Sequence, residues 1–309
     1  MEREDQMDAI QELKESCRRE DCPAWEAEPM SRHTTFRIGG PADLFLRPRT
    51  ARQAAQITAL ARQMGIPMLF LGRGSNLLVS DEGFRGAVIT LEDAVGEGPQ
   101  TLKDGLVSCP AGVSLTALCR FAAGQGLSGL EFAYGIPGSL GGGVFMNAGA
   151  YGGELGQVVG RVRFWDPQGG ERTLERADLA FSYRHSWFSE HADCLITEVE
   201  LTLFPGNPDS ITSRMEEHLR ARREKQPLDY PSAGSTFKRP ARAYASQLID
   251  SCGLKGLRVG GAMVSEKHAG FLINYDHATC ADVKALVEQV RRIVLERTGY
   301  LLECEIKFV

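Results

Sequence analysis

Residues 135–153 read GIPGSLGGGVFMNAGAYGG, and eight of these nineteen residues are glycine. Glycine adopts positive φ and carries no Cβ, so such a segment lets main-chain N–H groups come within hydrogen-bonding distance of a ligand. Successive N–H groups that face one concavity form an anion site of the kind that binds phosphate. A flexible linker is the alternative, but interleaved apolar residues favour burial of the segment: Ile136, Leu140, Val144, Phe145 and Met146.

A second glycine segment, LGRGSNLLVS at residues 71–80, follows an apolar stretch that is predicted to be a strand. It lacks the G-x-G-x-x-G pattern of dinucleotide-binding Rossmann folds, and no Lys-Ser or Lys-Thr pair ends it as in a Walker A loop. Two glycine segments of this type predict that main-chain groups bind a phosphate-bearing ligand. The missing patterns argue against both a Rossmann fold and a Walker A loop.

Length and charge limit the class of protein. A chain of 309 residues is typical of about two domains. The net charge of −5 argues against a nucleic-acid partner. No apolar run approaches the ~18 residues of a membrane span, and the acidic N-terminus lacks the pattern of a signal peptide. We therefore expect a cytoplasmic protein with no membrane or nucleic-acid partner, either a monomer or a weak homo-oligomer.

The eight cysteines are scattered and form neither a CxxC pair nor a zinc pattern. Because a chain of this length builds an adequate core, we expect reduced thiols that are mostly buried. The six histidines form no i, i+4 ligand pair, so no metal site is predicted.

Hydrophobic periodicity predicts mixed helices and strands. Apolar residues recur at helical spacing before residue 20, which predicts an accessory helix with one docked face: Met7, Ile10, Leu13 and Cys17. Strands are predicted at residues 43–47, 67–71, 87–90, 106–110, 158–165, 195–204, 271–274 and 302–309. Helices are predicted at residues 51–64, 115–123 (with Ser114 as the N-cap), 211–225, 245–252 and 281–298. A composition break at residues 205–210 places a domain boundary near residue 206.

Three further segments carry side chains suited to anionic ligands. FSYRHSWF (181–188) holds Tyr183 and Arg184, which alone are also typical of a surface stack. GSTFKRP (234–240) places one hydroxyl and two cations beside a tight turn: Ser235, Lys238 and Arg239. The alternative interpretation of this segment is a turn with solvated charges.

The C-terminal LLECEIKFV alternates, so Glu303 and Glu305 share one face of a predicted strand, with Ile306 and Phe308 on the other. An exposed strand edge is the alternative interpretation. Patterns and spacing lead no further than a phosphate-binding α+β protein.

Six segments, in order and spacing, resemble the UDP-N-acetylenolpyruvoylglucosamine reductase family. The resemblance runs from about residue 30 to the C-terminus and rests on TTFRIGGPA (34–42), GRGSNLLV (72–79), GLSGLEFAYGIPGSLGGGVFMNAGAYGGE (126–154), YRHSWF (183–188), PSAGSTFKRP (231–240) and GLKGLRVGGAMVSEKHAGFLIN (253–274).

The resemblance implies an α+β fold: a two-subdomain FAD-binding fold of the vanillyl-alcohol-oxidase/PCMH type, followed by a C-terminal α+β substrate-binding domain. It implies FAD-binding subdomains at 31–95 and 96–206, and a substrate-binding domain at 207–309. The N-terminal helix and tether that the sequence pattern predicts at residues 1–30 lie outside the resemblance.

The family resemblance also implies an enzyme, UDP-N-acetylmuramate dehydrogenase. With non-covalent FAD and NADPH, it reduces the enolpyruvyl ether of a UDP-sugar to UDP-N-acetylmuramate, a peptidoglycan precursor of the bacterial cell wall. The implied FAD contacts, through the main-chain N–H groups of both glycine segments, are Gly72, Arg73, Gly74, Ser75, Asn76, Leu77, Gly135, Ile136, Pro137, Gly138, Ser139, Gly141, Gly142, Asn147, Ala148 and Gly149.

Three catalytic residues follow from the same resemblance. Arg184 matches the cation that stabilises the enolate, which forms when hydride adds to the double bond. Glu305 matches a second stabilising group, and we expect it to share or donate a proton, because a bare carboxylate would repel the enolate. Ser235 matches the donor of a proton to the adjacent carbon. The implied substrate contacts are Tyr183, Lys238 and Arg239.

Two departures from the family pattern stand out. Arg239 occupies a position where asparagine is common, and the short stretch 188–204 leaves no room for the substrate-covering loop of some members, so the chain resembles the loop-lacking type. Two alternatives stay open at this stage. One is an alcohol or sugar oxidase of the same superfamily, although no histidine for covalent flavin attachment lies in residues 73–78. The other is a flavin- or nucleotide-binding regulator.

Overall fold

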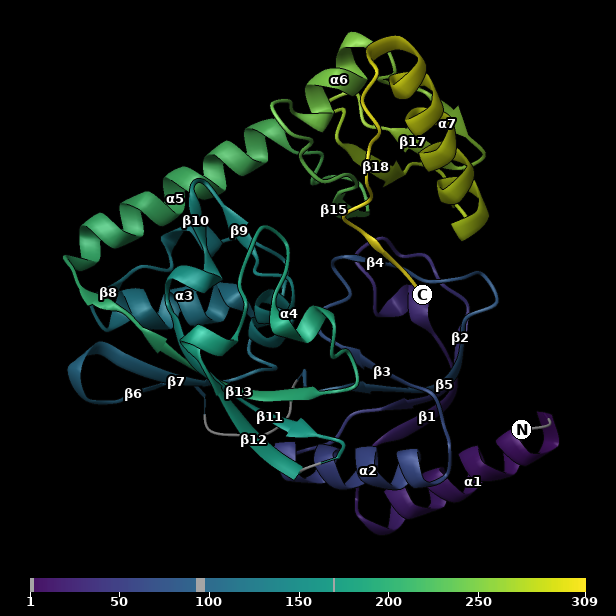
Figure 1. Cartoon of the computed structure of the whole chain (residues 1–309), viewed down its shortest axis with the longest axis vertical. Coiled ribbons are helices and arrows are strands. Elements are labelled where there is room, and N and C mark those ends of the chain that lie inside the picture. The colour runs from purple at the N-terminus through teal and green to yellow at the C-terminus, as the bar shows by residue number, and fades with distance from the viewer. Residues whose placement is uncertain (1–2, 93–97, 169) are drawn as a thin grey trace. The chain divides into compact units, whose positions relative to one another are not determined.

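The computed structural model describes residues 3–92, 98–168 and 170–309 (Figure 1). The chain forms two compact units, each built from segments that are distant in sequence. The first unit comprises Met1–Ala27, Asp43–Arg73 and Arg85–Arg220, and the second comprises Glu28–Ala42, Gly74–Phe84 and Ala221–Val309. The finer division that the family resemblance implies stays a prediction.

A four-stranded sheet in the order β1-β2-β5-β3, with most of its residues in the first unit, packs with two helices. These elements are α1 (Arg3–Arg19), β1 (Ala24–Pro29), β2 (Pro41–Leu46), α2 (Ala51–Gln63), β3 (Met68–Leu71) and β5 (Phe84–Thr90). Thr50 caps α2, because its hydroxyl accepts a hydrogen bond from the N–H of Gln53 at 3.1 Å.

The predicted docked face of the N-terminal helix is confirmed in part. Ile10, Leu13 and Cys17 are buried, but Met7 is 68% exposed, so the expected contact of Met7 is wrong. The expected tether is also wrong over residues 24–29, which form β1 and contribute an edge strand to the sheet.

A five-stranded antiparallel sheet in the order β12-β11-β13-β7-β6 forms the centre of the first unit. Its strands are β6 (Gln100–Thr101), β7 (Leu106–Pro110), β11 (Val159–Asp166), β12 (Gly170–Glu175) and β13 (Leu195–Thr202). Along β11 buried Val162 and Phe164 alternate with exposed Arg161 and Arg163, as the pleat of a strand requires. The arginines form ion pairs with glutamates of β13 on the exposed face.

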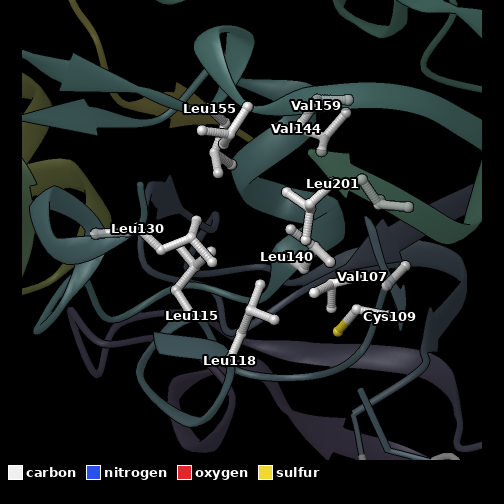
Figure 2. Close-up of a cluster of buried hydrophobic side chains, with 14 of the residues drawn as sticks. Val107, Cys109, Leu115, Leu118, Leu130, Leu140, Val144, Leu155, Val159 and Leu201 are labelled. Carbon is white, nitrogen blue, oxygen red and sulfur yellow. The ribbon is translucent and has the colours of Figure 1, made fainter. Parts of the chain in front are cut away.

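Helices α3 (Leu115–Gly124) and α4 (Leu140–Phe145) lie against this sheet (Figure 1). Figure 2 shows the core that they form with β7, β11 and β13, where leucine and valine side chains interdigitate. Ser114 caps α3 as predicted, with its hydroxyl 3.1 Å from the N–H of Ala117. Two small strand pairs complete the unit: β8 (Leu127–Ser128) with β14 (Phe204–Pro205), and β9 (Gly149–Ala150) with β10 (Gly153–Glu154).

The second unit contains a four-stranded antiparallel sheet in the order β15-β18-β17-β16, with α6 and α7. Its elements are β4 (Leu77–Leu78), β15 (Ser232–Ser235), α6 (Ala245–Ser251), β16 (Arg258–Val259), β17 (Ala262–Val264), β18 (Phe271–Asn274), α7 (Cys280–Thr298) and β19 (Lys307–Phe308). A capping box begins α7, since Thr279 and Asp282 exchange hydrogen bonds of 3.0 Å, and Gly299 ends it at φ +76°. Helix α5 (Pro208–Lys225) begins in the first unit and ends in the second.

The predicted C-terminal strand is wrong for most of its length. Only Lys307–Phe308 pairs as a strand, in parallel with β4, while Cys304 forms an isolated bridge with Phe237. Ile306 is buried as expected, but Phe308 is 44% exposed. Residues 302–309 therefore do not form one continuous strand with a single buried face, as their alternation predicted.

Each of the described helices is too short or too polar to cross a bilayer. Cys304 is half-buried and the other seven cysteines are buried, as predicted. Burial raises the pKa of the Cys119 thiol to about 12.

A buried carboxylate joins α5 to the turn before the glycine-rich segment 135–153. Glu131 accepts hydrogen bonds from Ser128 Oγ at 2.8 Å, from the N–H of Gly129 at 2.8 Å and from Arg214 Nη2 at 2.6 Å. Burial acts to raise the pKa of Glu131, but hydrogen bonds and the Arg214 charge outweigh it, so the pKa lies below its ordinary value. The ionised form thus stabilises the fold.

We expect Glu131→Gln to lower the free energy of unfolding at pH 7 by about 1–3 kcal/mol, because a buried donor loses its charged acceptor. A lowered folded-state pKa contributes stability above the unfolded value of about 4.3 and loses it as pH falls through the folded value. The difference from the parent should therefore shrink in acid. Urea unfolding of the FAD-loaded protein across pH measures this, with Asp193→Asn, which breaks an exposed ion pair, as the control. A difference that is constant with pH would contradict the assignment.

Candidate flavin site and catalytic residues

The first glycine loop, residues 72–77, connects β3 to β4 and exposes a run of main-chain donors. Within the described part of the chain, the N–H groups of residues 72–76 donate to no protein acceptor. Gly74 has φ +57°, and a Cβ there would lie 2.1 Å from the carbonyl oxygen of His33, so only glycine fits. This loop offers the successive unpaired donors that bind phosphate.

The second glycine loop, residues 135–153, is more ordered than the sequence indicates, because residues 140–145 form α4 with Ser139 as its N-cap. The predicted burial is confirmed for Leu140 and Val144, which are fully buried. It is confirmed only in part for Ile136, Phe145 and Met146, which are half-buried.

The main-chain donors of α4 are largely used within the fold. The N–H groups of Leu140 and Gly141 donate at 2.8 Å to carbonyls before α3, and that of Gly143 donates to Ser139. The N–H of Gly142 is held only by the Ser139 hydroxyl, at 3.3 Å. The expectation that glycines throughout this loop present N–H groups to a ligand is therefore wrong for Gly141, whose amide bonds to Ala111.

Gly72, at the start of the first glycine loop, lies beside the second glycine loop within the first unit. A Cβ on Gly72 would lie 2.4 Å from Ser139 Oγ, so glycine at position 72 allows this contact. Gly142 is exposed, and a Cβ there would meet only Ser139 Oγ within 4 Å. Within the first unit, the unpaired N–H donors of Gly72 and Arg73 and the exposed glycine of α4 are thus linked through Ser139.

The remaining predicted FAD contacts belong to these same two loops and differ in exposure. Arg73 is exposed and its guanidinium lies 2.8 Å from Glu92. Gly138 accepts a hydrogen bond from the N–H of Leu115. Asn147 is completely buried. The other predicted contacts are half-buried or exposed: Ser75, Asn76, Leu77, Gly135, Ile136, Pro137, Ala148 and Gly149.

Arg184 occupies a strained turn beside the second loop. Ser182 and His185 exchange main-chain hydrogen bonds of 3.1 Å, and Arg184 between them has φ +57°. Such a conformation costs about 1–3 kcal/mol in a residue other than glycine and is found most often at functional sites. The Arg184 guanidinium donates to the carbonyl of Gly149 at 3.2 Å and stacks on the ring of Tyr183, which is 50% exposed.

The second unit brings Ser235 and Glu305 onto neighbouring segments. Ser235 ends β15, and the N–H of Glu305 donates at 2.8 Å to the carbonyl of the next residue, Thr236. The carbonyl of Glu305 accepts a hydrogen bond from the Asn76 amide at 3.1 Å. The second unit thus places the predicted proton donor and the predicted carboxylate beside residues 74–77 of the first glycine loop.

The two cations of the serine turn have protein partners. Lys238 Nζ lies 3.5 Å from a carboxylate oxygen of Glu303, and both side chains are well exposed. The Arg239 guanidinium stacks on Tyr244 at 4.5 Å from the ring centroid. Among the described residues, no cluster of three or more His, Cys, Asp or Glu side chains could hold a metal ion.

The segment TTFRIGG was recognised in the sequence but given no role. Its Thr35 donates its hydroxyl to the carbonyl of Ser232 at 2.7 Å, and the N–H of Thr35 donates to the carbonyl of Gly74. This segment therefore supports both the first glycine loop and the strand that carries Ser235. The two adjacent threonines of this segment could have indicated a structural role in the sequence, but no local pattern indicated that Thr35 bonds to Ser232 and Gly74.

A family model described as "FAD binding domain" matches residues 42–175. A second, described as "UDP-N-acetylenolpyruvoylglucosamine reductase, C-terminal domain", matches residues 226–309. Together with the glycine loops, these matches define an FAD-dependent oxidoreductase with an FAD-binding domain followed by a C-terminal α+β domain.

Relatives identify the family. The chain is 47% identical over 285 residues to the UDP-N-acetylenolpyruvoylglucosamine reductase of Lachnoclostridium phytofermentans, covering 91% of each chain. It is 45% identical to that of Caldanaerobacter subterraneus subsp. tengcongensis, covering 91% of this chain and 92% of the relative. The crystal structure of the Thermus caldophilus enzyme matches with a TM-score of 0.77 and 35% identity, over 93% of this chain and 98% of that one.

This chain belongs to the UDP-N-acetylenolpyruvoylglucosamine reductase family. Membership indicates FAD as its cofactor and NADPH as the reductant. The residues fit a flavin dinucleotide, because the first loop presents unpaired N–H donors and, within the first unit, Gly72 and Gly142 leave the space around Ser139 without side chains of their own.

We expect Gly142→Val to reduce the FAD content of the purified protein several-fold, because a branched side chain would cover the surface beside the first loop. Gly124→Val is the matched control, since Gly124 is also an exposed helical glycine of the first unit and has no neighbour within 4 Å of an added Cβ. Flavin absorbance per polypeptide measures occupancy, and the melting temperature of the FAD-free protein checks the fold. Full occupancy in Gly142→Val would place the pyrophosphate elsewhere.

Proposed function

We propose that this chain reduces the enolpyruvyl ether of UDP-N-acetylenolpyruvoylglucosamine to the lactyl ether of UDP-N-acetylmuramate, with NADPH as the reductant, in cytoplasmic peptidoglycan precursor synthesis. The observation that carries the proposal is the strained Arg184 turn, whose guanidinium lies 3.2 Å from the carbonyl of Gly149 in the second glycine loop. The names of the relatives supply the substrate.

The predicted FAD contacts of the two glycine loops would hold the cofactor, with Gly72 to Asn76 on its pyrophosphate. Bound FAD, reduced by NADPH, would supply hydride to the terminal carbon of the enolpyruvyl double bond. No histidine lies in residues 72–77 to form a covalent flavin link, so the cofactor should leave on denaturation.

Arg184 stabilises the charge that develops on the substrate carboxylate. A guanidinium presents paired N–H donors in the plane that a carboxylate or enolate requires. The stack on Tyr183 and the hydrogen bond to Gly149 restrict its rotamers, so it is oriented before the substrate arrives. Preorganised donors of this kind usually make the largest contribution to catalysis.

Ser235 donates a proton to the carbon next to the ether oxygen, and Glu305 supports the enolate through a shared or donated proton. The main-chain hydrogen bond between Glu305 and Thr236 ties the two segments together, so both side chains are carried by one supported framework in the second unit. The proposed substrate contacts are Tyr183 in the first unit, and Lys238 and Arg239 in the second.

Arg184→Lys should lower turnover by about tenfold to a thousandfold, because lysine keeps the charge but loses the planar pair of donors. Steady-state kinetics with the enolpyruvyl sugar measures the loss. Arg163→Lys, on the exposed face of the sheet, is the control and should leave turnover unchanged. Near-normal turnover in Arg184→Lys would make Arg184 a structural residue.

Ser235→Ala separates the two half-reactions. The flavin absorbance of the variant should bleach with NADPH at close to the parent rate, because Ser235 acts only on the substrate carbon. Re-oxidation by the enolpyruvyl sugar should slow by about a hundredfold or more, as is typical of lost general acid catalysis. Stopped-flow absorbance follows both rates, and Ser251→Ala on α6 is the control. Slow bleaching with normal re-oxidation would assign Ser235 to the nicotinamide or flavin site.

A further inference from the structure

The arginine turn is held from both sides by the end of the second glycine loop. Ser186 donates its hydroxyl to the carbonyl of Phe145 at 2.8 Å, just after the turn. Asn147 donates its side-chain N–H to the carbonyl of Ser182 at 2.9 Å, at the start of the turn. The segment that ends α4 therefore contacts the chain on each side of Arg184.

Asn147 satisfies both ends of its amide inside the protein. Its Oδ1 accepts a hydrogen bond from the N–H of Gly156 at 2.8 Å, while its Nδ2 bonds to Ser182. The side chain is completely buried, and its backbone has φ +43°. A buried amide that is bonded on both sides fixes the segments it joins, because breaking either bond leaves a polar group unpaired.

The family resemblance implies a main-chain cofactor contact for Asn147, but the N–H of Asn147 donates to the carbonyl of Val144 at 3.1 Å. The Asn147 side chain has no exposed surface, and main-chain groups bond to both its Oδ1 and its Nδ2. Its hydrogen bonds therefore join segments of the protein. The segments that it joins are the second glycine loop and the arginine turn.

We propose that Asn147 is a positioning residue, whose buried amide holds the Ser182–His185 turn against the second glycine loop and so aims the Arg184 guanidinium. The inference rests on the proposed role of Arg184 in catalysis. It assigns to Asn147 an effect on turnover that passes through Arg184 and leaves FAD affinity unchanged.

Asn147→Asp is the sharpest variant, because a carboxylate can still accept from Gly156 but cannot donate to Ser182. Turnover should fall by about ten- to a hundredfold, the scale of a small misplacement of a catalytic group. FAD affinity, measured by titrating the apoprotein, should stay within about twofold of the parent. Thr197→Val, which removes another side-chain-to-carbonyl hydrogen bond of the first unit, is the control.

A double-mutant cycle tests the route of the effect. In an Arg184→Ala background, Asn147→Asp should cause no further loss of turnover, because the group that it positions is gone. Ser186→Ala should behave in the same way, with a smaller loss, since Ser189 also donates to the carbonyl of Phe145. This second variant keeps the test open if the buried aspartate prevents folding.

The possible outcomes separate the two claims. If Arg184→Ala itself retains turnover, the proposed role of Arg184 fails, and the positioning role fails with it. Suppose instead that Arg184→Ala loses turnover. If Asn147→Asp then lowers turnover by the same factor in the parent and in the Arg184→Ala background, or lowers it in neither, only the positioning role is overturned. A large loss of FAD affinity in Asn147→Asp would restore Asn147 as a cofactor contact.

Discussion

The close packing of helix α4 is the constraint on which the rest of the first unit depends. A Cβ on Gly143 would lie 2.7 Å from Leu155 Cδ1, and a Cβ on Gly141 would lie 3.0 Å from that of Ala111. Without side chains at these positions, α4 can contact the end of β7 and the short 3-10 helix Leu155–Gln157 directly, and the core in Figure 2 closes around it. The glycine-rich sequence is therefore required first for packing, and only then for binding.

This packing fixes what the second loop presents to a ligand. Because α4 uses the N–H groups of Leu140, Gly141 and Gly143 internally, the unpaired donors lie instead on the first loop, at residues 72–76. The contact between Gly72 and Ser139 joins the two. In α4 only Gly142 is exposed, and it has no side chain, whereas residues 72–76 carry N–H groups that no protein acceptor uses in the described part of the chain. Two segments that look alike in sequence thus have different physical roles.

The segment that follows α4 also contacts the turn of Arg184, the arginine proposed to act in catalysis. The chain leaves α4 through Asn147 and Gly149, and both residues make hydrogen bonds to the turn that contains Arg184. The strain of positive φ at Arg184 persists because the turn is bonded on either side. In the second unit, residues 34–35 play a comparable part, since they support residues of the first glycine loop and the strand of Ser235. Each segment that carries a proposed catalytic residue is thus held by hydrogen bonds to a neighbouring segment of its own unit.

Local sequence determined most of the elements and predicted a phosphate-bearing ligand, while FAD followed only from the family resemblance. Helices with clear caps, such as the one that begins after Ser114, and strands with alternating burial, such as β11, were predicted to within a few residues, because their signals are local. The six family segments determined the family. Tertiary structure alone decided that Gly141 and Gly143 serve packing, that residues 24–29 join a sheet, and that only Lys307–Phe308 pairs as a strand near the C-terminus. It also decided the partners of Asn147. These outcomes depend on residues far away in the chain, and no local pattern records which distant atoms will fill the space beside a residue.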